Sequence, residues 1–234
     1  MLAGNKILLG LLFFCSASAF AQESLPRILI GLELSNGIPV GSFRQQLEDV
    51  DAALGFGFEA HYRLNASGPW FLGIDAGTVR YEKIRNLMWI DGERFPVKTT
   101  FHFTTVGATA TYMPRMDKVQ PFITVMAGVA VLYTATKSDK SFFELLFNNF
   151  ENELIYDKNH VTPALGIVPG IQLGKGPVRF RASCKFMFAG KVNHVDPSSL
   201  EVDDINEITY NYRTTYPRMV IPEVGISVLI GSLE

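Results

Sequence analysis

The segment from Leu54 to Leu64 alternates strictly between two kinds of side chain. Every second residue, Phe56 and Phe58 among them, is apolar, whereas the residues between them are glycine, histidine or charged, such as Glu59 and Arg63. A period of two is the side-chain period of a β-strand, so the two faces of this strand meet different surroundings. Similar alternation returns in about eight segments, and several of them place charges where a soluble barrel would need apolar filling. The pattern therefore predicts a barrel whose outer surface contacts lipid and whose interior is polar.

The alternating segments predict eight strands, separated by connections of two kinds. The strands cover residues 28–35, 54–64, 70–81, 98–113, 121–133, 161–173, 178–188 and 220–230. Three connections are short and rich in turn-forming residues, and they cover residues 65–69, 114–118 and 174–177. The other four are long and cover residues 36–53, 82–97, 135–160 and 190–218. Short turns at one rim and long loops at the other are typical of outer-membrane barrels.

The fourth predicted strand shows a break in its period. Phe101 and Phe103 are out of phase with Val106, Ala108 and Ala110. One extra residue in a strand exchanges its two faces, so a β-bulge within this segment would restore the period.

The first residues of the chain have the pattern of an export signal. Lys6 provides a positive start, residues 7–14 form a short apolar core, and Ala19-Phe20-Ala21 matches the small-residue pattern that precedes a cleavage site. We therefore expect a signal peptide over residues 1–21 and one outer-membrane β-barrel domain over residues 22–234.

Composition narrows the classes of function. The formal net charge of −2 gives no reason to expect nucleic-acid binding. The chain is 47% hydrophobic, yet no later apolar segment is long enough to cross a bilayer as a helix. Apolar residues at alternate positions instead fit a transmembrane barrel, in which every second strand residue faces lipid. After cleavage Cys184 is a single cysteine, which excludes a disulfide within the mature chain.

The chain resembles the small eight-stranded outer-membrane barrels of the OmpA/OmpX type, found in Gram-negative bacteria. The residues that carry the resemblance are the alternating strands, such as 54–64 and 121–133, the rhythm of the connections, and the closing strand 220–230. The resemblance implies an all-β fold: an eight-stranded antiparallel up-and-down transmembrane β-barrel in the outer membrane. One departure is the end of the chain, Leu233-Glu234, because such barrels often end in an aromatic residue. The family pattern includes no catalytic or ligand motif.

Charged and titratable side chains fall on the inward face of the predicted strands. Arg27 lies at the start of the first strand. The others are Glu33, Glu59, His61, Arg63, Asp75, Arg179, Arg181, Lys185 and Glu223. The interior of an eight-stranded barrel is just wide enough for side chains to fill it, and an unpaired buried charge is strongly unfavourable. We therefore predict a structural network of mixed sign. A narrow ion path is the alternative, and a catalytic site in the lumen is favoured less than either.

Aromatic residues near the strand ends predict interfacial girdles at the two surfaces of a bilayer. Those near the short turns are Trp70, Phe71, Tyr112, Phe122 and Phe180, and those near the long loops are Tyr81, Tyr133 and Phe188. The alternative is that these rings are ordinary buried aromatic side chains.

The loop between the fifth and sixth predicted strands contains apolar residues with helical spacing. The candidate contact surface consists of Phe142, Phe143, Leu146, Phe147 and Phe150. Exposed apolar groups on a loop can meet a partner or lie on the outer leaflet. The alternative, that they cap the mouth of the barrel with no partner, is slightly favoured.

No residue set in the sequence has the spacing of a catalytic or metal site. His160 and His194 lie on or near long loops with Ser138 and Ser141 available, but their spacing matches no hydrolase signature. The acidic residues of the last long loop lack the spacing of an EF-hand. We therefore expect no enzyme, no cofactor and no metal site.

The function that the sequence favours is a structural, adhesive or interaction role of an outer-membrane barrel through long extracellular loops. The alternatives are a small porin-like channel, an accessory barrel of a secretion or assembly system and, less favoured, a lipid-modifying enzyme. The expected partners are outer-membrane lipid and a protein or surface ligand at the loops, with no nucleic acid. A soluble lipocalin-like barrel with an apolar lumen is the architectural rival.

Overall fold

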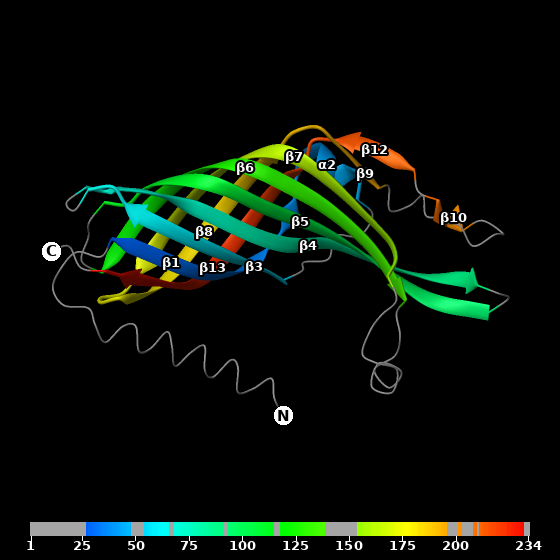
Figure 1. Cartoon of the computed structure of the whole chain (residues 1–234), viewed down its shortest axis with the longest axis horizontal. Helices are drawn as coiled ribbons and strands as arrows, with labels where there is room; N and C mark the ends of the chain where they lie inside the picture. The colour runs from blue at the N-terminus through cyan, green and yellow to red at the C-terminus, as the bar shows by residue number, and fades with distance from the viewer. Residues whose placement is uncertain are drawn as a thin grey trace, which may run out of the picture.

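The computed structural model describes residues 27–47, 54–65, 68–90, 93–114, 118–138, 154–195, 201–202, 208–209 and 211–231. Within them, eight long antiparallel strands close into a barrel (Figure 1). They are β1 (Ile28–Asn36), β3 (Leu54–Arg63), β4 (Trp70–Ile90), β5 (Glu93–Tyr112), β6 (Val119–Ser138), β7 (Leu154–Leu173), β8 (Val178–Ala189) and β13 (Arg218–Ile230). Each pairs with the next along the chain, and β1 pairs with β13 to close the wall. The predicted eight-stranded up-and-down barrel is confirmed, while the predicted signal peptide lies outside the described residues.

Smaller elements gather at the end of the barrel that carries the long connections (Figure 1). The short helix α2 (Gly41–Gln45) follows β2 (Ile38–Pro39), which pairs with β13. The remaining elements form two small two-stranded sheets: β9 (Val192–Val195) pairs with β12 (Tyr212–Thr215), and β10 (Glu201–Val202) pairs with β11 (Ile208–Thr209).

The outer wall of the barrel is apolar, as the alternation predicts. Leu54 and Phe56 on β3 are 82% and 67% exposed, whereas Glu59 and His61 on its other face are 1% and 3% exposed. Such a surface is unfavourable in water and matches a lipid environment. Among the described residues, no helix combines the length and the apolar character that crossing a bilayer would require.

The connection expected over residues 82–97 is largely strand instead of loop. β4 continues to Ile90 and β5 begins at Glu93, and the two strands stay paired up to those residues. Strands β6 and β7 are also longer than expected at this end, reaching Ser138 and starting at Leu154. The three predicted short turns do separate consecutive strands at the other end.

The irregularity expected in β5, the strand that contains Phe101, lies instead in the neighbouring strand β4. The register between β4 and β5 shifts between Arg80 and Glu82, where Tyr81 and Glu82 are both buried. β5 keeps its period, with Phe101 and Phe103 pointing inward, each 1% exposed. The expectation of a bulge within β5 was therefore wrong, because both faces of β5 carry apolar residues and the period alone cannot distinguish inside from outside.

The lumen has three layers and is not polar throughout, contrary to expectation. The ion-paired residues, Glu33, Glu59, Asp75, Arg181, Lys185 and Glu223, occupy the middle. Toward the long connections lies the upper apolar cluster, formed by Phe43, Leu47, Val79, Tyr81, Phe101, Phe103, Met126, Ala130, Leu132, Ala164, Met187, Ala189, Val192, Val195, Met219 and Ile221. Toward the short turns lies the lower apolar cluster, formed by Leu29, Phe71, Met113, Phe122, Val168 and Leu229.

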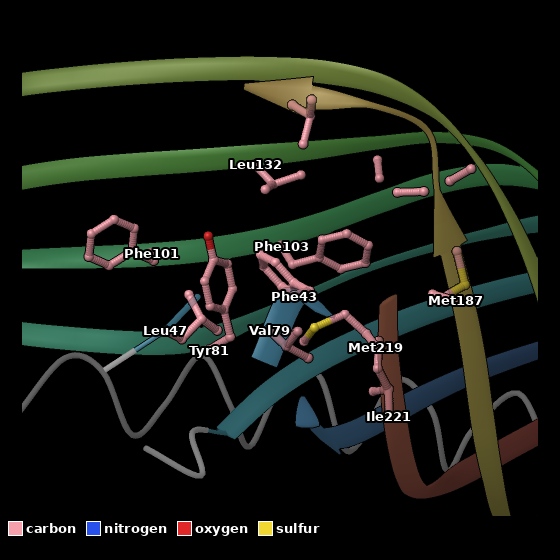
Figure 2. Close-up of a cluster of buried hydrophobic side chains, with 14 of the residues drawn as sticks. Phe43, Leu47, Val79, Tyr81, Phe101, Phe103, Leu132, Met187, Met219 and Ile221 are labelled. Atoms are coloured by element: carbon pink, nitrogen blue, oxygen red, sulfur yellow. The ribbon is translucent and has the colours of Figure 1, made fainter. Parts of the chain in front are cut away.

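Helix α2 places Phe43 at the centre of the upper apolar cluster (Figure 2). The Phe43 side chain is completely buried, and its ring lies 5.3 Å from that of Tyr81 in an edge-to-face arrangement. The ring of His194 from β9 lies 5.8 Å away on another side. The helix therefore fills the mouth of the barrel with an aromatic side chain from the first long connection.

The predicted aromatic girdles are only partly formed. Trp70 and Tyr112 are outward and exposed, with ring centroids 5.1 Å apart, and Phe180 and Phe188 are also about half exposed. Phe71, Phe122 and Tyr81, in contrast, are at most 5% exposed and belong to the two luminal clusters. The alternative, that these rings are ordinary buried side chains, is correct for these three because they occupy inward positions on their strands.

Candidate functional site

The charged layer of the lumen is the candidate site, and five strands supply its side chains. β1, β3 and β4 contribute Glu33, Glu59 and Asp75, and β13 contributes Glu223. These carboxylates are between 1% and 5% exposed. β8 supplies Arg181 and Lys185, each 2% exposed, which lie four residues apart on the inward face. Each carboxylate therefore has a cation on a different strand within reach.

Arg181 joins the carboxylates of β1 and β3. Its Nε lies 2.9 Å from Oε1 of Glu33, and its Nη1 lies 2.6 Å from Oε1 of Glu59. The guanidinium also lies over the ring of Phe122, 3.8 Å from the ring centroid. The face of an aromatic ring attracts a cation, so the lower apolar cluster supports the same side chain that the carboxylates hold.

His61 extends this group toward the next strands. Its Nε2 lies 2.9 Å from Oε2 of Glu59, and its Nδ1 lies 3.3 Å and 3.4 Å from the hydroxyls of Thr109 and Thr111. The Thr111 hydroxyl is in turn 2.7 Å from that of Thr124 on β6. The hydrogen-bonded chain therefore runs from β3 across β5 to β6.

Lys185 holds the second pair of carboxylates. Its Nζ lies 2.9 Å from Oδ1 of Asp75 and 2.9 Å from Oε1 of Glu223. The hydroxyl of Ser183 donates to the other carboxylate oxygen of Glu223 at 3.0 Å. Lys185 thus links β8 to β4 and β13 in the way that Arg181 links it to β1 and β3.

The structure brings seven of the ten predicted inward residues into this network and places three elsewhere. Arg63 is buried beside the lower apolar cluster, with its guanidinium 4.7 Å from the ring centroid of Phe71. Arg179 is half-buried near a short turn, where it donates to the side chain of Gln120 and to the carbonyl of Gly176. Arg27 is exposed and contacts the Tyr62 hydroxyl.

Sequence reasoning missed the hydroxyl and amide groups that complete the layer. Inward threonines recur at every second position on β5 around Thr109 and Thr111, a pattern that could have indicated a polar partner for the charges. Gln172 donates to Ser227 across the barrel, a pair that only the strand arrangement reveals.

The predicted loop residues do not form a described site. Phe142, Phe143, Leu146, Phe147 and Phe150 lie outside the described residues. His160 lies beside the ring of Tyr212, and His194 contacts the backbone carbonyl of Arg213 beneath α2. Among the described residues, no group of three potential metal-ligating side chains is present.

Comparison with solved structures identifies proteins of similar architecture. The structure superposes on Neisserial surface protein A with a TM-score of 0.50 and 13% sequence identity, covering 87% of this chain and 97% of that one. The chain has the fold of the small outer-membrane β-barrels. A major outer membrane protein from Thermus thermophilus gives a TM-score of 0.48 at 11% identity, covering 86% of this chain and 98% of that one.

A third solved structure is Ail, the attachment invasion locus protein of Yersinia pestis, in complex with the heparin analogue sucrose octasulfate. Its TM-score is 0.39 at 14% identity, covering 88% of this chain and 99% of that one. No protein-family model matches the chain. No curated protein matches its sequence.

Replacing Arg181 by methionine should destabilise the barrel strongly. The substitution removes the cation from Glu33 and Glu59 and leaves two buried carboxylates unpaired, which should cost about 3–5 kcal/mol of unfolding free energy. Urea unfolding in phospholipid vesicles, followed by tryptophan fluorescence, measures the change. Arg179→Met is the matched control, with an expected loss below about 1 kcal/mol because Arg179 is only half-buried.

A triple variant separates the charge from the packing. Arg181→Met combined with Glu33→Gln and Glu59→Gln leaves no unpaired charge, so it should regain much of the stability that Arg181→Met loses. Equal stability of Arg181→Met and the unmodified chain would show that the network does not hold the barrel together.

Proposed function

We propose that this chain is an exported, integral outer-membrane β-barrel without an open channel and without catalytic activity. Its role is structural and interactive, through the sheet that extends beyond the barrel at the end with the long connections. The observation that carries the proposal is the closed, three-layered lumen inside an apolar wall, combined with strands that continue past the wall.

The height of the apolar wall supports insertion into a bilayer. Ile123, Val125 and Val129 are about half exposed on the outer face of β6, and Tyr133 lies on the same face. From Ile123 to Tyr133 the strand rises about 33 Å, or about 25 Å along the membrane normal at the usual tilt. That height matches the apolar band of outer-membrane barrels.

The layers of the lumen argue against a channel. Ions would have to pass the upper apolar cluster, then a network in which Arg181 and Lys185 are each held by two carboxylates, then the lower apolar cluster. Phe43 fills the mouth, and Phe122 lies directly against Arg181 at the other side of the charged layer. This arrangement favours a structural core and argues against a pore.

The same layers argue against catalysis at His61. A histidine between a carboxylate and a hydroxyl, as with Glu59 and Thr111, has the order of groups found in hydrolases. All three side chains are at most 3% exposed and lie between the two apolar clusters. A substrate has no route to the hydroxyl, so the arrangement supports a structural hydrogen-bond network.

The projecting sheet supports an interaction role. We define it as residues 79–90, 93–103, 132–138 and 154–160 of β4–β7. β3 pairs with β4 only up to Thr78, and β8 pairs with β7 only from Ala164 onward. Within the described residues, the β4 edge of this sheet therefore has no strand partner, whereas β9 packs against β7 and Tyr212 of β12 lies beside His160 at the other edge. Exposed strand edges bind further strands readily, and Figure 1 shows the β4–β5 hairpin reaching beyond the barrel.

Insertion is tested by fractionation and gel mobility. The chain should be found in the outer-membrane fraction, and unheated and boiled samples should migrate differently on SDS gels because a closed barrel resists the detergent. Recovery in the soluble periplasmic fraction, with no such shift, would reverse the assignment of the apolar face and favour a soluble barrel.

Channel activity is tested by conductance. The purified chain in planar bilayers should give no steady single-channel steps, because two apolar clusters and the ion-paired layer block the lumen. Reproducible steps that scale with salt concentration would contradict the closed lumen and favour the porin-like alternative.

The interaction role is tested by shortening the hairpin. Residues 84–99 are replaced by Asn-Gly, a two-residue hairpin turn, because Lys83 and Thr100 are direct cross-strand partners. Cells that display the full chain should adhere to epithelial monolayers, and cells that display the shortened barrel should lose most of that adhesion while the gel shift is retained. Unchanged adhesion would remove the hairpin from the proposed role.

A further inference from the structure

We propose that a basic cluster on the outer wall binds the phosphate group of a lipid headgroup in the outer leaflet. The proposal rests on the membrane insertion proposed above and adds the chemistry of a specific lipid contact. The basic cluster consists of Arg80, Lys83 and Arg85 on β4, Lys98 and His102 on β5, and Lys137 on β6.

The strand period directs the β5 and β6 members of the cluster outward. Thr99 is 4% exposed and Thr136 is completely buried, and their hydroxyls are 2.9 Å apart inside the sheet. Their neighbours Lys98 and Lys137 therefore occupy the opposite face, and Lys137 is exposed.

The irregularity in β4 adds a third strand to the same face. Tyr81 and Glu82 are both buried at the register shift, so the inward positions change from odd to even residue numbers. Arg80 before the shift and Lys83 and Arg85 after it consequently all face outward. Without the extra residue, Lys83 and Arg85 would point into the mouth of the barrel.

The register aligns like charges directly across the strands. Arg85 is the Cα partner of Lys98, and Lys98 is the partner of Lys137. Like charges directly opposite each other destabilise a sheet, and a bound anion offsets that cost. Arg85 and Lys98 also interact with other groups of the protein. Among the described residues of these rows, the acidic ones are Asp157 on β7, opposite Ala135, and Glu82, which is buried on the inward face, so positive charge dominates the outer face.

The height of the cluster places it among lipid headgroups. Val106 and Val129 are cross-strand partners and are 49% and 41% exposed on the apolar wall. Tyr133 lies four residues above Val129, about 13 Å along the strand, and the cluster begins at that level. The exposed ends of β3 and β8 carry Leu54 and Phe188 instead. Arg218 on β13 lies opposite Phe188, so the group of several cations is confined to the β4–β6 side of the barrel.

The position and the charge of the basic cluster together indicate which kind of ligand it binds. Several cations on neighbouring strands of one face favour a phosphate group, whose oxygens accept charge-assisted hydrogen bonds from lysine and arginine. The cluster faces sideways from the wall, at the end of the apolar band, and not from the tip of the projecting sheet. A phosphorylated lipid lying against the wall fits this position better than a soluble polyanion approaching from above.

The test uses the full chain reconstituted in nanodiscs of phosphatidylcholine with a minor fraction of phosphatidic acid, which carries a phosphomonoester. Native mass spectrometry counts the phosphatidic acid retained on the released protein. The variant Arg80→Gln, Lys83→Gln, Lys137→Gln should retain it about 10- to 100-fold less, as expected for the loss of three cations near a membrane surface. The matched control, Arg44→Gln, Lys175→Gln, Arg218→Gln, removes three exposed cations that lie outside β4, β5 and β6, so the control variant should retain phosphatidic acid unchanged.

The outcomes separate this proposal from the proposed function. Each variant is first checked for the gel shift, so a failure of the unmodified chain to insert overturns the proposed function and is seen independently. If the triple variant does not insert, the single substitution Lys137→Gln is measured in its place, with a smaller loss expected. Equal retention by cluster and control variants overturns the lipid site. Equally tight binding of a heparin fragment in detergent, lost in the same variant, would overturn it in favour of a soluble polyanion.

Discussion

Two buried cations hold the middle of this barrel. Arg181 and Lys185 lie on one strand, β8, and together they bind carboxylates from β1, β3, β4 and β13. An apolar exterior leaves the lumen as the place for charged strand residues, and a charge in the lumen is stable only when it is paired. The apolar clusters above and below exclude water from the pairs, which strengthens their attraction. The ion pairing of the lumen is therefore a consequence of where the strand charges have to be placed.

The sequence predicted the strands in the wall of the barrel well. It predicted poorly how far those strands extend at the end with the long connections. Strict alternation, as from Leu54 to Arg63, identifies a strand because the two faces meet lipid and lumen. Residues 82–97 lack that alternation in the sequence, so the period alone did not identify them as strand. A signal was nevertheless present in the sequence: Asp91-Gly92 is a dipeptide that is favoured in two-residue hairpin turns.

The composition of the charged layer was also predictable, but its pairing was not. Strand alternation shows that Glu59 and Arg181 point inward, whereas their contact depends on strand order and register around a closed barrel. The aromatic residues show the same limit. Trp70 and Phe71 are adjacent in sequence, yet one is exposed on the wall and the other is buried in the lower apolar cluster. The side of the sheet decides the environment of each ring.

The unbroken pairing of β4 with β5 has a mechanical consequence. Cross-strand partners run from Ile90 and Glu93 at the tip down to Trp70 and Tyr112 at the other rim, with one irregularity between Arg80 and Glu82. A pull on the tip is therefore carried along two continuous strands into the barrel, without an intervening flexible linker. The β4–β5 hairpin would transmit force as a rigid element. Bending under load would concentrate between Arg80 and Glu82, where the register shifts.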